Sequence, residues 1–350
     1  MKILITHEIF PPEFVGGGEK LMLKLATMLL KNGHSVKILT TGNPKIKKYD
    51  HIPTIRIPIN RYGMMLALPK IIGQAKDVDL IQTSSGNSCL PSWFAAKILN
   101  KPICCYVHHI LGKYWKNVKG PLLGSVFESM EKNFLIRDYD AIIFQNKSSM
   151  QLGLEYGIKK SKTYLLQPGI DYKKFQMKIK KKPFVLFVGN FDMNESICKT
   201  KGLSYLIEAA RQLPEIRFVV VGKGSYLNKL KKISPPNIDF TGPLIGKPLI
   251  KLFNEAMIFC LPSLNEGFGL TILEAMASGC AIISTIDIGQ EGIIIKPKNT
   301  EQIKKAVEVL LDNQAKTIKI GQKNRELAKK FTWNKFLDDV IKIYDSVIRK

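Results

Sequence analysis

Two carboxylates eight residues apart, Glu266 and Glu274, enclose a Gly-Phe-Gly turn in the stretch SLNEGFGLTILEAMASG, residues 263–279. The apolar pattern after the turn predicts a helix that begins near Gly269, with Glu266 in the preceding loop and Glu274 in the early turns. Free N–H groups at a helix N-terminus bind anions such as phosphate, and glycines allow the backbone to come close. Carboxylates on either side could accept hydrogen bonds from sugar hydroxyls. An ordinary helix with an acidic first turn is the simpler alternative.

A second glycine-rich turn consists of Gly16, Gly17 and Gly18 in PPEFVGGGEK. It follows a predicted strand and opens a predicted helix, so it is a second candidate for an anion-binding turn. A GxGxxG dinucleotide fingerprint is excluded because the third glycine position is Leu21, and a Walker A loop is excluded because no Lys-Ser/Thr pair follows. A tight turn without a ligand is the alternative.

His108 and His109 directly follow the apolar run ICCYV, which predicts a strand. In an open α/β sheet, side chains at the carboxyl end of a strand face the crevice where ligands bind. A histidine in that place could contribute to chemistry near neutral pH, although a lone histidine is more often structural.

Together these motifs resemble glycosyltransferase family 4, a family of retaining enzymes built from two Rossmann-like domains, the GT-B fold. Glu266 and Glu274 correspond to the E-x7-E signature of the family, in the context PS-x-x-EGFG followed by EAMA-x-G. Further segments that resemble the family run along nearly the whole chain: FPPEFVGGGEK, KNGHSVKILT, PGIDYKKF, KGLSYLIEAA, VVVGKG, DFTGPL and FTWNKF.

The resemblance implies roles for the motif that contains the two carboxylates. Glu266 is expected to contact the transferred hexose, and Glu274 the ribose of the nucleotide. The backbone of Phe268, Gly269 and Leu270 is expected to hold the sugar or the phosphate. The glycine turn described above is expected to approach the diphosphate and the acceptor.

The resemblance also assigns groups outside that motif. His108 aligns with a family histidine beside the donor hexose, with His109 as the alternative, and Lys201 aligns with a lysine that neutralises the diphosphate leaving group. His108, Glu266 and Lys201 are thus the candidate catalytic residues. The family arginine that accompanies the lysine corresponds to Asn190 here. Lys199 could replace its charge, but a solvated lysine is the preferred interpretation.

Contacts to the nucleotide base are expected from the turns around Gly222, Gly224 and Thr241. The loop after AIISTIDIG is shorter than is usual in the family, so contacts from it are expected to be missing.

Short apolar runs alternate with amphipathic segments along the chain, and the pattern restarts near residue 184. Such alternation predicts βαβ units and parallel sheets. The predicted fold class is α/β, with two doubly wound Rossmann-like domains that face each other across a cleft. The domains are expected at 1–170, on the acceptor side, and 184–332, on the nucleotide-sugar side, with a Lys-rich hinge at 171–183. A helix at 333–350 is expected to return to the first domain, as in the family.

The net charge of the 350 residues is +24, and Lys supplies 46 of the 53 cations. Such a charge attracts anionic partners, although compositional drift towards Lys is an equal alternative. Arg is scarce and no aromatic-rich RNA-binding signature is present, so no nucleic-acid partner is expected. Two apolar stretches, 111–136 and 64–72, could lie in the interface of an anionic membrane, with core packing as the slightly preferred alternative.

No apolar stretch approaches the 18 residues of a membrane span, and the N-terminus is predicted to be a strand and not a signal peptide. The six cysteines form no CxxC pair, as is typical of buried, reduced thiols in the cytoplasm. Asp77-Val78-Asp79 spells the DxD motif that binds a metal in another class of glycosyltransferase, but it is predicted to join a helix end to a strand start. We therefore expect no metal ion and no cofactor.

The predicted reaction is the transfer of a hexose, with retention, from a nucleotide-diphosphate sugar to a hydroxyl group. The acceptor is expected to be a glycan or a lipid-linked molecule in the synthesis of cell-surface glycans or glycolipids. The chain is expected in the cytoplasm, in part at the inner face of the membrane. A catalytically silent nucleotide-sugar-binding subunit, or a phosphorylase or epimerase of the same architecture, remains as the alternative.

Overall fold

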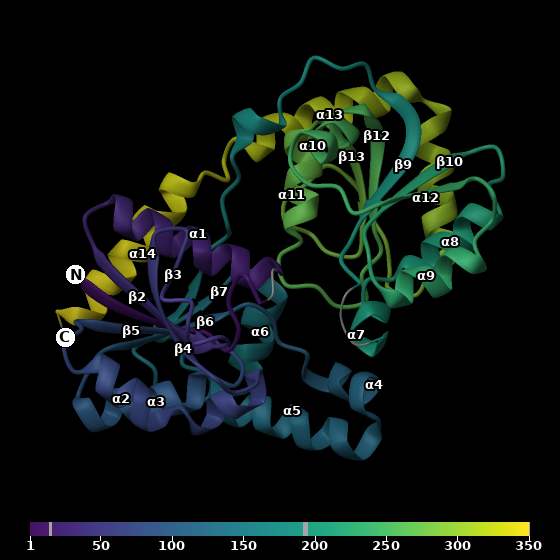
Figure 1. Cartoon of the computed structure of the whole chain (residues 1–350). Coiled ribbons are helices and arrows are strands. Elements are labelled where there is room, and N and C mark those ends of the chain that lie inside the picture. Colours follow the sequence, from purple (N-terminus) through teal and green to yellow (C-terminus); the bar gives the residue numbers. More distant parts are fainter. Residues whose placement is uncertain (14–15, 192–194, 350) are drawn as a thin grey trace. The chain divides into compact units, whose positions relative to one another are not determined.

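The chain folds into two α/β units, and the structure, a computed structural model, describes residues 1–13, 16–191 and 195–349 (Figure 1). Unit 1 comprises Met1–Pro168 and Asn334–Lys350, and unit 2 comprises Gly169–Trp333. Each unit contains one largely parallel sheet with its own hydrophobic core. None of the helices within the described ranges is long and apolar enough to cross a membrane.

Unit 1 contains the following elements in chain order: β1 Lys2–Thr6, α1 Gly17–Lys31, β2 Ser35–Thr41, β3 Lys48–Tyr49, β4 Ile52–Ile57, η1 Arg61–Leu66, α2 Leu68–Ala75, β5 Leu80–Ser84, α3 Cys89–Leu99, β6 Ile103–Val107, η2 Gly112–Tyr114, α4 Trp115–Lys119, α5 Pro121–Leu135, β7 Ala141–Phe144, α6 Lys147–Glu155, η3 Lys160–Lys162, β8 Thr163–Leu165 and, from the chain end, α14 Trp333–Ile348.

The sheet of unit 1 has the strand order β3-β4-β2-β1-β5-β6-β7-β8, and every neighbouring pair is parallel except β3 with β4. The chain starts at β1 in the middle, continues to β2 on one side and later to β5 on the other. The point where the order reverses therefore lies between β1 and β5, and ligands of such sheets bind outside the carboxyl ends of the strands there. In Figure 1, α1 and α14 cover one face of this sheet, and α2 and α3 the other.

The central strands of unit 1 are buried on both faces because helices cover both sides. β5, β6 and β7 are buried at every position. The covering helices are amphipathic: in α1, Leu21, Leu25 and Leu29 lie at helical spacing and are fully buried. Each such leucine contributes about 1.5–3 kcal/mol by burial, so these faces hold the helices on the sheet.

The last helix, α14, completes unit 1 although it is separated from the rest of that unit by all of unit 2. The hydroxyl of Tyr344 donates a buried hydrogen bond of 2.8 Å to Oε1 of Gln82 in β5. The ring of Phe336 contacts Tyr106 in β6, with ring centres 6.4 Å apart. These contacts fix α14 over the middle of the sheet.

Unit 2 contains η4 Tyr172–Phe175, β9 Lys182–Val188, α7 Glu195–Lys199, α8 Leu203–Arg211, β10 Arg217–Val221, α9 Ser225–Lys232, β11 Ile238–Gly242, α10 Lys247–Glu255, β12 Ala256–Leu261, α11 Leu270–Ala277, β13 Ala281–Ser284, β14 Gly292–Ile294, α12 Thr300–Asp312 and α13 Gln314–Ala328.

The sheet of unit 2 is entirely parallel, with the order β11-β10-β9-β12-β13-β14. The order reverses between β9, the first strand, and β12. α8 packs with α12, and α11 with α13. The candidate ligand-binding edge of unit 2 is thus formed by the loops that follow β9 and β12.

The segment 171–183, where the sequence analysis expected a hinge, carries η4 and the first residues of β9. Lys182 pairs with Ala256 in the register of β9 and β12. The ammonium of Lys181 is buried and donates to the carbonyl oxygens of Phe253 (3.1 Å) and Ala256 (2.8 Å), and this burial lowers its pKa. The Lys-rich end of the segment is therefore bound to β12 of unit 2.

Candidate functional site

Lys201 and Glu266 form an ion pair where the strand order of unit 2 reverses. The ammonium of Lys201 lies 2.7 Å from Oε2 of Glu266, and their side chains are 26% and 17% exposed. Lys201 lies in the turn between α7 and α8, and Glu266 in the loop between β12 and α11. The structure therefore brings together two residues that the sequence analysis named separately.

The backbone holds these two loops against each other. The amide of Leu264 donates to the carbonyl oxygen of Thr200 over 2.7 Å. Gly202 has a φ of +70°, and a Cβ at this position would lie 1.9 Å from the carbonyl oxygen of Pro262. Only glycine permits this approach without displacement of one loop, so Gly202 sets the position of the neighbouring Lys201.

The carboxylate of Glu266 has partners in its own loop. It accepts from the hydroxyl of Ser263 and from the amide of Gly267, both over 3.3 Å. The carbonyl oxygen of Ser263 in turn accepts from the hydroxyl of Thr285, which follows β13. The loops after β12 and β13 therefore share the support of this carboxylate.

The predicted start of the helix after Glu266 agrees with the structure, where α11 begins at Leu270 with Gly269 as its N-cap at a φ of +78°. Phe268 is buried and its ring packs near Phe331, with centres 6.1 Å apart, so its backbone is held rigidly at the helix start. Glu274 lies one turn into α11 and is half-buried. The two acids thus flank a helix N-terminus, the arrangement that suits a phosphate between sugar-binding carboxylates.

The loops after β9 and β10 lie side by side. The amide of Gly189 donates to the carbonyl oxygen of Val221, and that of Phe191 to the carbonyl oxygen of Lys223. Asn190 lies between these two bonds and is half-buried. Asn190, which stands at the position of the family arginine, therefore lies at the same edge of the sheet as the turn that follows β10.

The residues proposed for base contacts follow the neighbouring strands β10 and β11. Gly222 approaches the loop of β9 so closely that a Cβ would lie 2.2 Å from the carbonyl oxygen of Gly189. Gly224 is the N-cap of α9, at a φ of +132°. Thr241 is exposed at the end of β11, and its hydroxyl donates to the carbonyl oxygen of Gly242.

Lys199, considered as a replacement for the missing arginine, lies at the end of α7. Its ammonium is 3.0 Å from the carboxylate of Glu195 within the same short helix, and both side chains are largely exposed. This geometry describes a solvated surface pair of little energetic weight.

In unit 1, His108 directly follows β6 and its ring lies against the first turn of α1. A Cβ built on Gly18 would lie 3.3 Å from Cγ and Nδ1 of this ring. Nε2 of His108 is 3.2 Å from the hydroxyl of Ser84, and the ring centre of His7 is 5.5 Å away. Ser84 ends β5 and His7 follows β1, so this cluster lies where the strand order reverses.

Both histidines of this cluster are held in the neutral form. Burial lowers the pKa of His7 to about 4, and burial together with His7 lowers the pKa of His108 to about 3. Nδ1 of His108 is buried without a hydrogen-bond partner in the structure. A neutral imidazole can offer this atom to a ligand as a donor or an acceptor, according to its tautomer.

Glu8, which the sequence analysis did not name, forms a second polar cluster at the same edge. Its carboxylate accepts from the amide (2.9 Å) and the side chain (2.6 Å) of Asn87 and pairs with the guanidinium of Arg61. A Cβ on Gly86 would lie 3.0 Å from Oε2 of Glu8. Glu8 lies two residues after the end of β1, and an acid so close to the carboxyl end of the first strand is the signal that could have indicated it.

The glycine turn before α1 is capped by a residue of its own helix. The amide of Gly16 donates to the carboxylate of Glu19 over 2.9 Å, and burial raises the pKa of this carboxyl group. Gly17 is the first residue of α1, and Gly18, which follows it, lies beside His108. Of the three glycines, Gly18 therefore has the most specific structural requirement.

The Asp77-Val78-Asp79 sequence lies between the end of α2 and the start of β5. Oδ2 of Asp79 accepts from the amide of Lys2 over 2.7 Å, a contact that joins β5 to the start of β1. Among the residues that the structure describes, no group of three or more His, Cys, Asp or Glu side chains could hold a metal ion.

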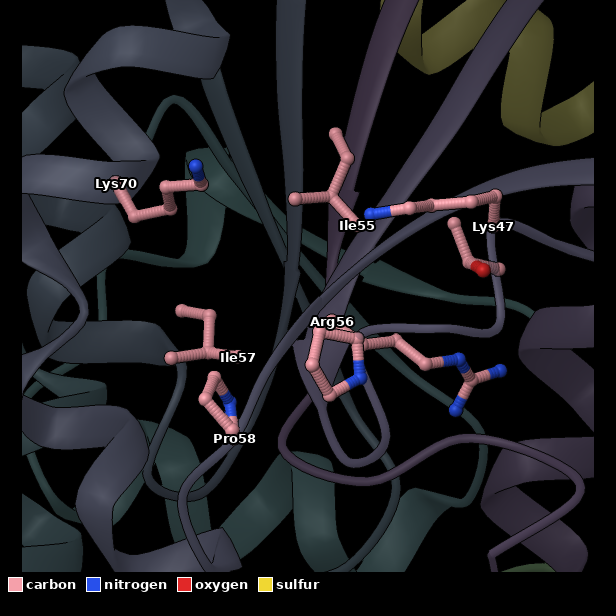
Figure 2. Close-up of a pocket in the computed structure, with 8 residues that line it drawn as sticks. Lys47, Ile55, Arg56, Ile57, Pro58 and Lys70 are labelled. Atoms are coloured by element: carbon pink, nitrogen blue, oxygen red, sulfur yellow. The ribbon is translucent and has the colours of Figure 1, made fainter.

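A pocket of about 400 Å³ lies along β4 in unit 1 and is shown in Figure 2. In the figure, Lys47 and Lys70 come from different segments on either side of Ile55 and Ile57. The guanidinium of Arg56 is engaged by Glu13 and by the backbone. None of the residues predicted for the donor lines this pocket, so it is distinct from the edge that carries His108. Its lining residues are Pro44, Lys47, Thr54, Ile55, Arg56, Ile57, Pro58 and Lys70.

Two family models match successive parts of the chain. "Glycosyltransferase Family 4" matches residues 15–174, and "Glycosyl transferases group 1" matches residues 182–313. Among solved structures, HepE of Anabaena in complex with UDP and glucose aligns with a TM-score of 0.79 and 18% identity, over 99% of this chain and 100% of HepE.

Two curated relatives also match. N,N'-diacetylbacillosaminyl-diphospho-undecaprenol alpha-1,3-N-acetylgalactosaminyltransferase of Campylobacter jejuni is 24% identical over 303 residues, which are 78% of this chain and 78% of the relative. Alpha-monoglucosyldiacylglycerol synthase of Streptococcus pneumoniae is 28% identical over 313 residues, which are 80% of this chain and 70% of the relative.

The full-length likeness to HepE and the two largely parallel sheets define the class: this is a protein of the GT-B fold, and the predicted α/β class with two Rossmann-like domains is confirmed. The two family models together extend over most of both units. The chain belongs to glycosyltransferase family 4, whose members are also described as glycosyl transferases group 1. It is a retaining glycosyltransferase that uses a nucleotide sugar.

Proposed function

We propose that this glycosyltransferase transfers a hexose from a nucleotide-diphosphate sugar to a hydroxyl of a glycan or lipid-linked acceptor in the cytoplasm, without a metal ion. The observation that carries the proposal is the Lys201–Glu266 pair beside the N-terminus of α11. A cation, a helix N-terminus and a second acid, Glu274, at one sheet edge supply what a diphosphate sugar requires.

In this proposal, Lys201 and the amides that start α11 neutralise the diphosphate as it leaves. The bond between the anomeric carbon and the phosphate oxygen breaks, and the acceptor oxygen attacks from the same face, so the configuration is retained. The acceptor proton passes to the departing phosphate oxygen. Removal of one such stabilising group typically costs about 10²–10³ in kcat, so Lys201 carries a main share of the catalysis.

Glu266 holds Lys201 in place before the donor arrives and then contacts hydroxyls of the hexose, while Glu274 binds the ribose. His108 contributes a neutral imidazole beside the hexose. A double displacement is not part of the proposal, because Glu266 is assigned to the hexose hydroxyls and Glu274 to the ribose, which leaves no pair of carboxylates to flank the bond.

The names of the relatives support the donor and acceptor classes. HepE was solved with UDP and glucose, which favours a UDP-hexose as the first donor to test. The Campylobacter jejuni enzyme is named for a diphospho-undecaprenol acceptor, and the Streptococcus pneumoniae enzyme for a diacylglycerol glycolipid. Both names contain a lipid, and the net charge of +24 suits an anionic membrane surface.

The test is a thermal-shift screen against UDP-, GDP- and ADP-sugars, followed by kinetics with the donor that stabilises the protein. A ligand at one hundred times its Kd adds about 2.7 kcal/mol to the stability.

Glu274→Gln should weaken donor binding, Glu266→Gln should mainly lower kcat, and Lys201→Met should lower kcat by about 100-fold. As a control, Lys305→Met removes a comparable charge from an exposed ion pair on α12. It should change neither donor binding nor kcat. Full activity of all three site variants would overturn the site.

A catalytically silent binding subunit is the second candidate, because Asn190 stands where the family has an arginine. Slow donor hydrolysis in the absence of an acceptor distinguishes the two: an active enzyme releases free sugar, whereas a silent subunit binds the donor without turnover. A dependence of turnover on inorganic phosphate would instead indicate a phosphorylase.

A further inference from the structure

The large apolar side chains that unit 1 exposes are concentrated in one part of its sequence. Within the described residues of that unit they all fall between 62 and 136: Tyr62, Leu66, Phe94, Ile98, Leu122, Leu123, Val126, Met130 and Ile136. Of the two apolar stretches that the sequence analysis named, 64–72 places Met64 and Ile71 in the core. The stretch 111–136 instead exposes much of its apolar surface.

Helix α5 carries four of these nine side chains, all on one side. Leu122, Leu123, Val126 and Met130 are 84%, 60%, 53% and 40% exposed. At 3.6 residues per turn, these four positions fall within about 100° of one another around the helix axis. They form one continuous stripe, and Figure 1 shows α5 at the periphery of unit 1.

The acidic residues of α5 lie on the opposite side of the helix. The carboxylate of Glu131 accepts from the amides of Leu111 (3.0 Å) and Gly112 (2.7 Å), and burial raises its pKa. Glu128 pairs with Lys116 of α4 over 3.7 Å. A helix that faces water usually has the reverse arrangement, with its acids outside and its apolar side chains inside. The outer face of α5 is therefore built for a partner other than water.

The stripe is rigidly supported by α4. A Cβ on Gly124 would lie 2.4 Å from Cα of Lys116, so this glycine allows the two helices to touch. The rings of Trp115 and Phe127 pack with centres 5.0 Å apart. The apolar face is thus presented by a packed helix pair.

Exposed lysines lie on the segment that packs against α5. Lys113, Lys116 and Lys119 are exposed on η2 and α4, and Lys119 lies over the ring of Phe127, the residue after Val126 of the stripe, at 5.4 Å. Lys116 pairs with Glu128 on the opposite side of α5. A second copy of this chain would bring two proteins of net charge +24 together, whereas an anionic surface attracts such a charge.

We propose that the surface formed by α4 and α5 docks on an anionic lipid membrane, with the apolar stripe at the acyl boundary and Lys119 among the lipid phosphates. This surface deepens the proposed function, because it is where the enzyme would meet a lipid-linked acceptor. It is tested without any sugar donor, so its failure would leave the proposed transfer standing.

The experiment is co-sedimentation of the full chain with vesicles of equal parts phosphatidylglycerol and phosphatidylcholine, and with phosphatidylcholine alone, at low and high salt. The triple substitution Leu122→Ser, Leu123→Ser and Val126→Ser removes the stripe. We expect the wild type to bind the anionic vesicles at low salt and the triple variant to bind roughly tenfold or more weakly. High salt and neutral lipid should each weaken the binding of the wild type.

The matched control replaces exposed apolar residues of unit 2, with Ile233→Ser, Ile245→Ser and Val309→Ser, which are 61%, 84% and 62% exposed in the wild type. It should bind vesicles like the wild type. Both variants should keep the wild-type melting temperature and donor-dependent thermal shift, since neither changes the core or the candidate site. Wild-type protein that stays in solution with anionic vesicles, or a triple variant that binds as tightly, would overturn the proposal. So would a wild-type dimer that the triple substitution dissociates, because the stripe would then be a self-association surface.

Discussion

The contact between Gly18 and His108 allows a test that separates the position of one side chain from the stability of the protein. Gly18→Ala adds a Cβ that would lie 3.3 Å from Cγ and Nδ1 of His108. Gly73→Ala is the matched control, because Gly73 also lies in a helix of unit 1 and a Cβ there meets nothing within 4 Å.

The size of the effect follows from ordinary contact distances. Carbon atoms prefer separations of about 3.5–4.0 Å, so the ring of His108 must move by a few tenths of an ångström. A displacement of about 1 Å can cost 100-fold in rate, and the smaller shift should therefore lower kcat roughly four- to tenfold. Alanine also favours the helix by up to about 1 kcal/mol over glycine, which offsets the cost of the contact.

The assay measures kcat, KM and the melting temperature of both variants with the donor found by the screen. Gly73→Ala should melt about 2–4 °C higher and keep its kcat, as expected for a gain of 1 kcal/mol in a unit of this size. Gly18→Ala should stay folded and lose kcat. An unchanged kcat in Gly18→Ala, or an equal loss in both variants, would refute the reasoning that His108 acts from this position.

Two further predictions concern stability. Gly202→Ala should lower the free energy of unfolding by at least about 3 kcal/mol, because a positive φ and a Cβ at 1.9 Å from the carbonyl oxygen of Pro262 both oppose it. Gly33→Ala, with a φ of +79° and open space around its Cβ, should lower it by only about 1–2 kcal/mol. Urea unfolding measures both losses. The pKa of His7 is about 4 in the folded protein and near 6.5 in the unfolded chain, so the unfolded chain binds a proton first as the pH falls. The contribution of His7 to the free energy of unfolding is therefore complete above pH 6.5 and is smaller by about 2 kcal/mol at pH 5. His108, whose pKa is also lowered, acts in the same direction. Urea unfolding at both pH values should show a smaller loss in His7→Gln than in the wild type, and an equal loss would contradict this assignment.

The parallel architecture could be predicted because buried strands such as 103–107 are continuous apolar runs between amphipathic helices. The start of β9 could not be predicted, since Lys182 carries no apolar signal. Its backbone pairs with Ala256, and that pairing depends on the register of the whole sheet. The short edge strands of unit 1, β3 and β8, likewise depend on pairing with their neighbouring strands.

For the candidate site, the sequence motifs identified the residue types but not their contacts. Lys201 and Glu266 were named from separate segments, and their ion pair depends on the close approach of Gly202 to the loop after β12. Glu8 and Arg61 were missed because their partners are distant in sequence and share no motif. Only the strand order brings such residues to one edge.

The orientation of α5 shows a different limit. Its sequence mixes leucines, lysines and glutamates, and composition alone allowed either core packing or an exposed apolar face. The outcome depends on Gly124, where α4 fits against α5, and on the backbone amides that draw Glu131 inward. Neither contact has a periodic signal in the sequence.

The return of α14 to unit 1 has a consequence for the order in which the protein can be completed. Unit 2 is one uninterrupted segment, and it can fold as soon as that segment has been synthesised. Unit 1 is begun before unit 2 but receives α14 after it, because Tyr344 reaches Gln82 only once the ribosome has translated α14. A nascent chain therefore lacks the helix that packs on β5 and β6 of its first unit until all of unit 2 has been synthesised.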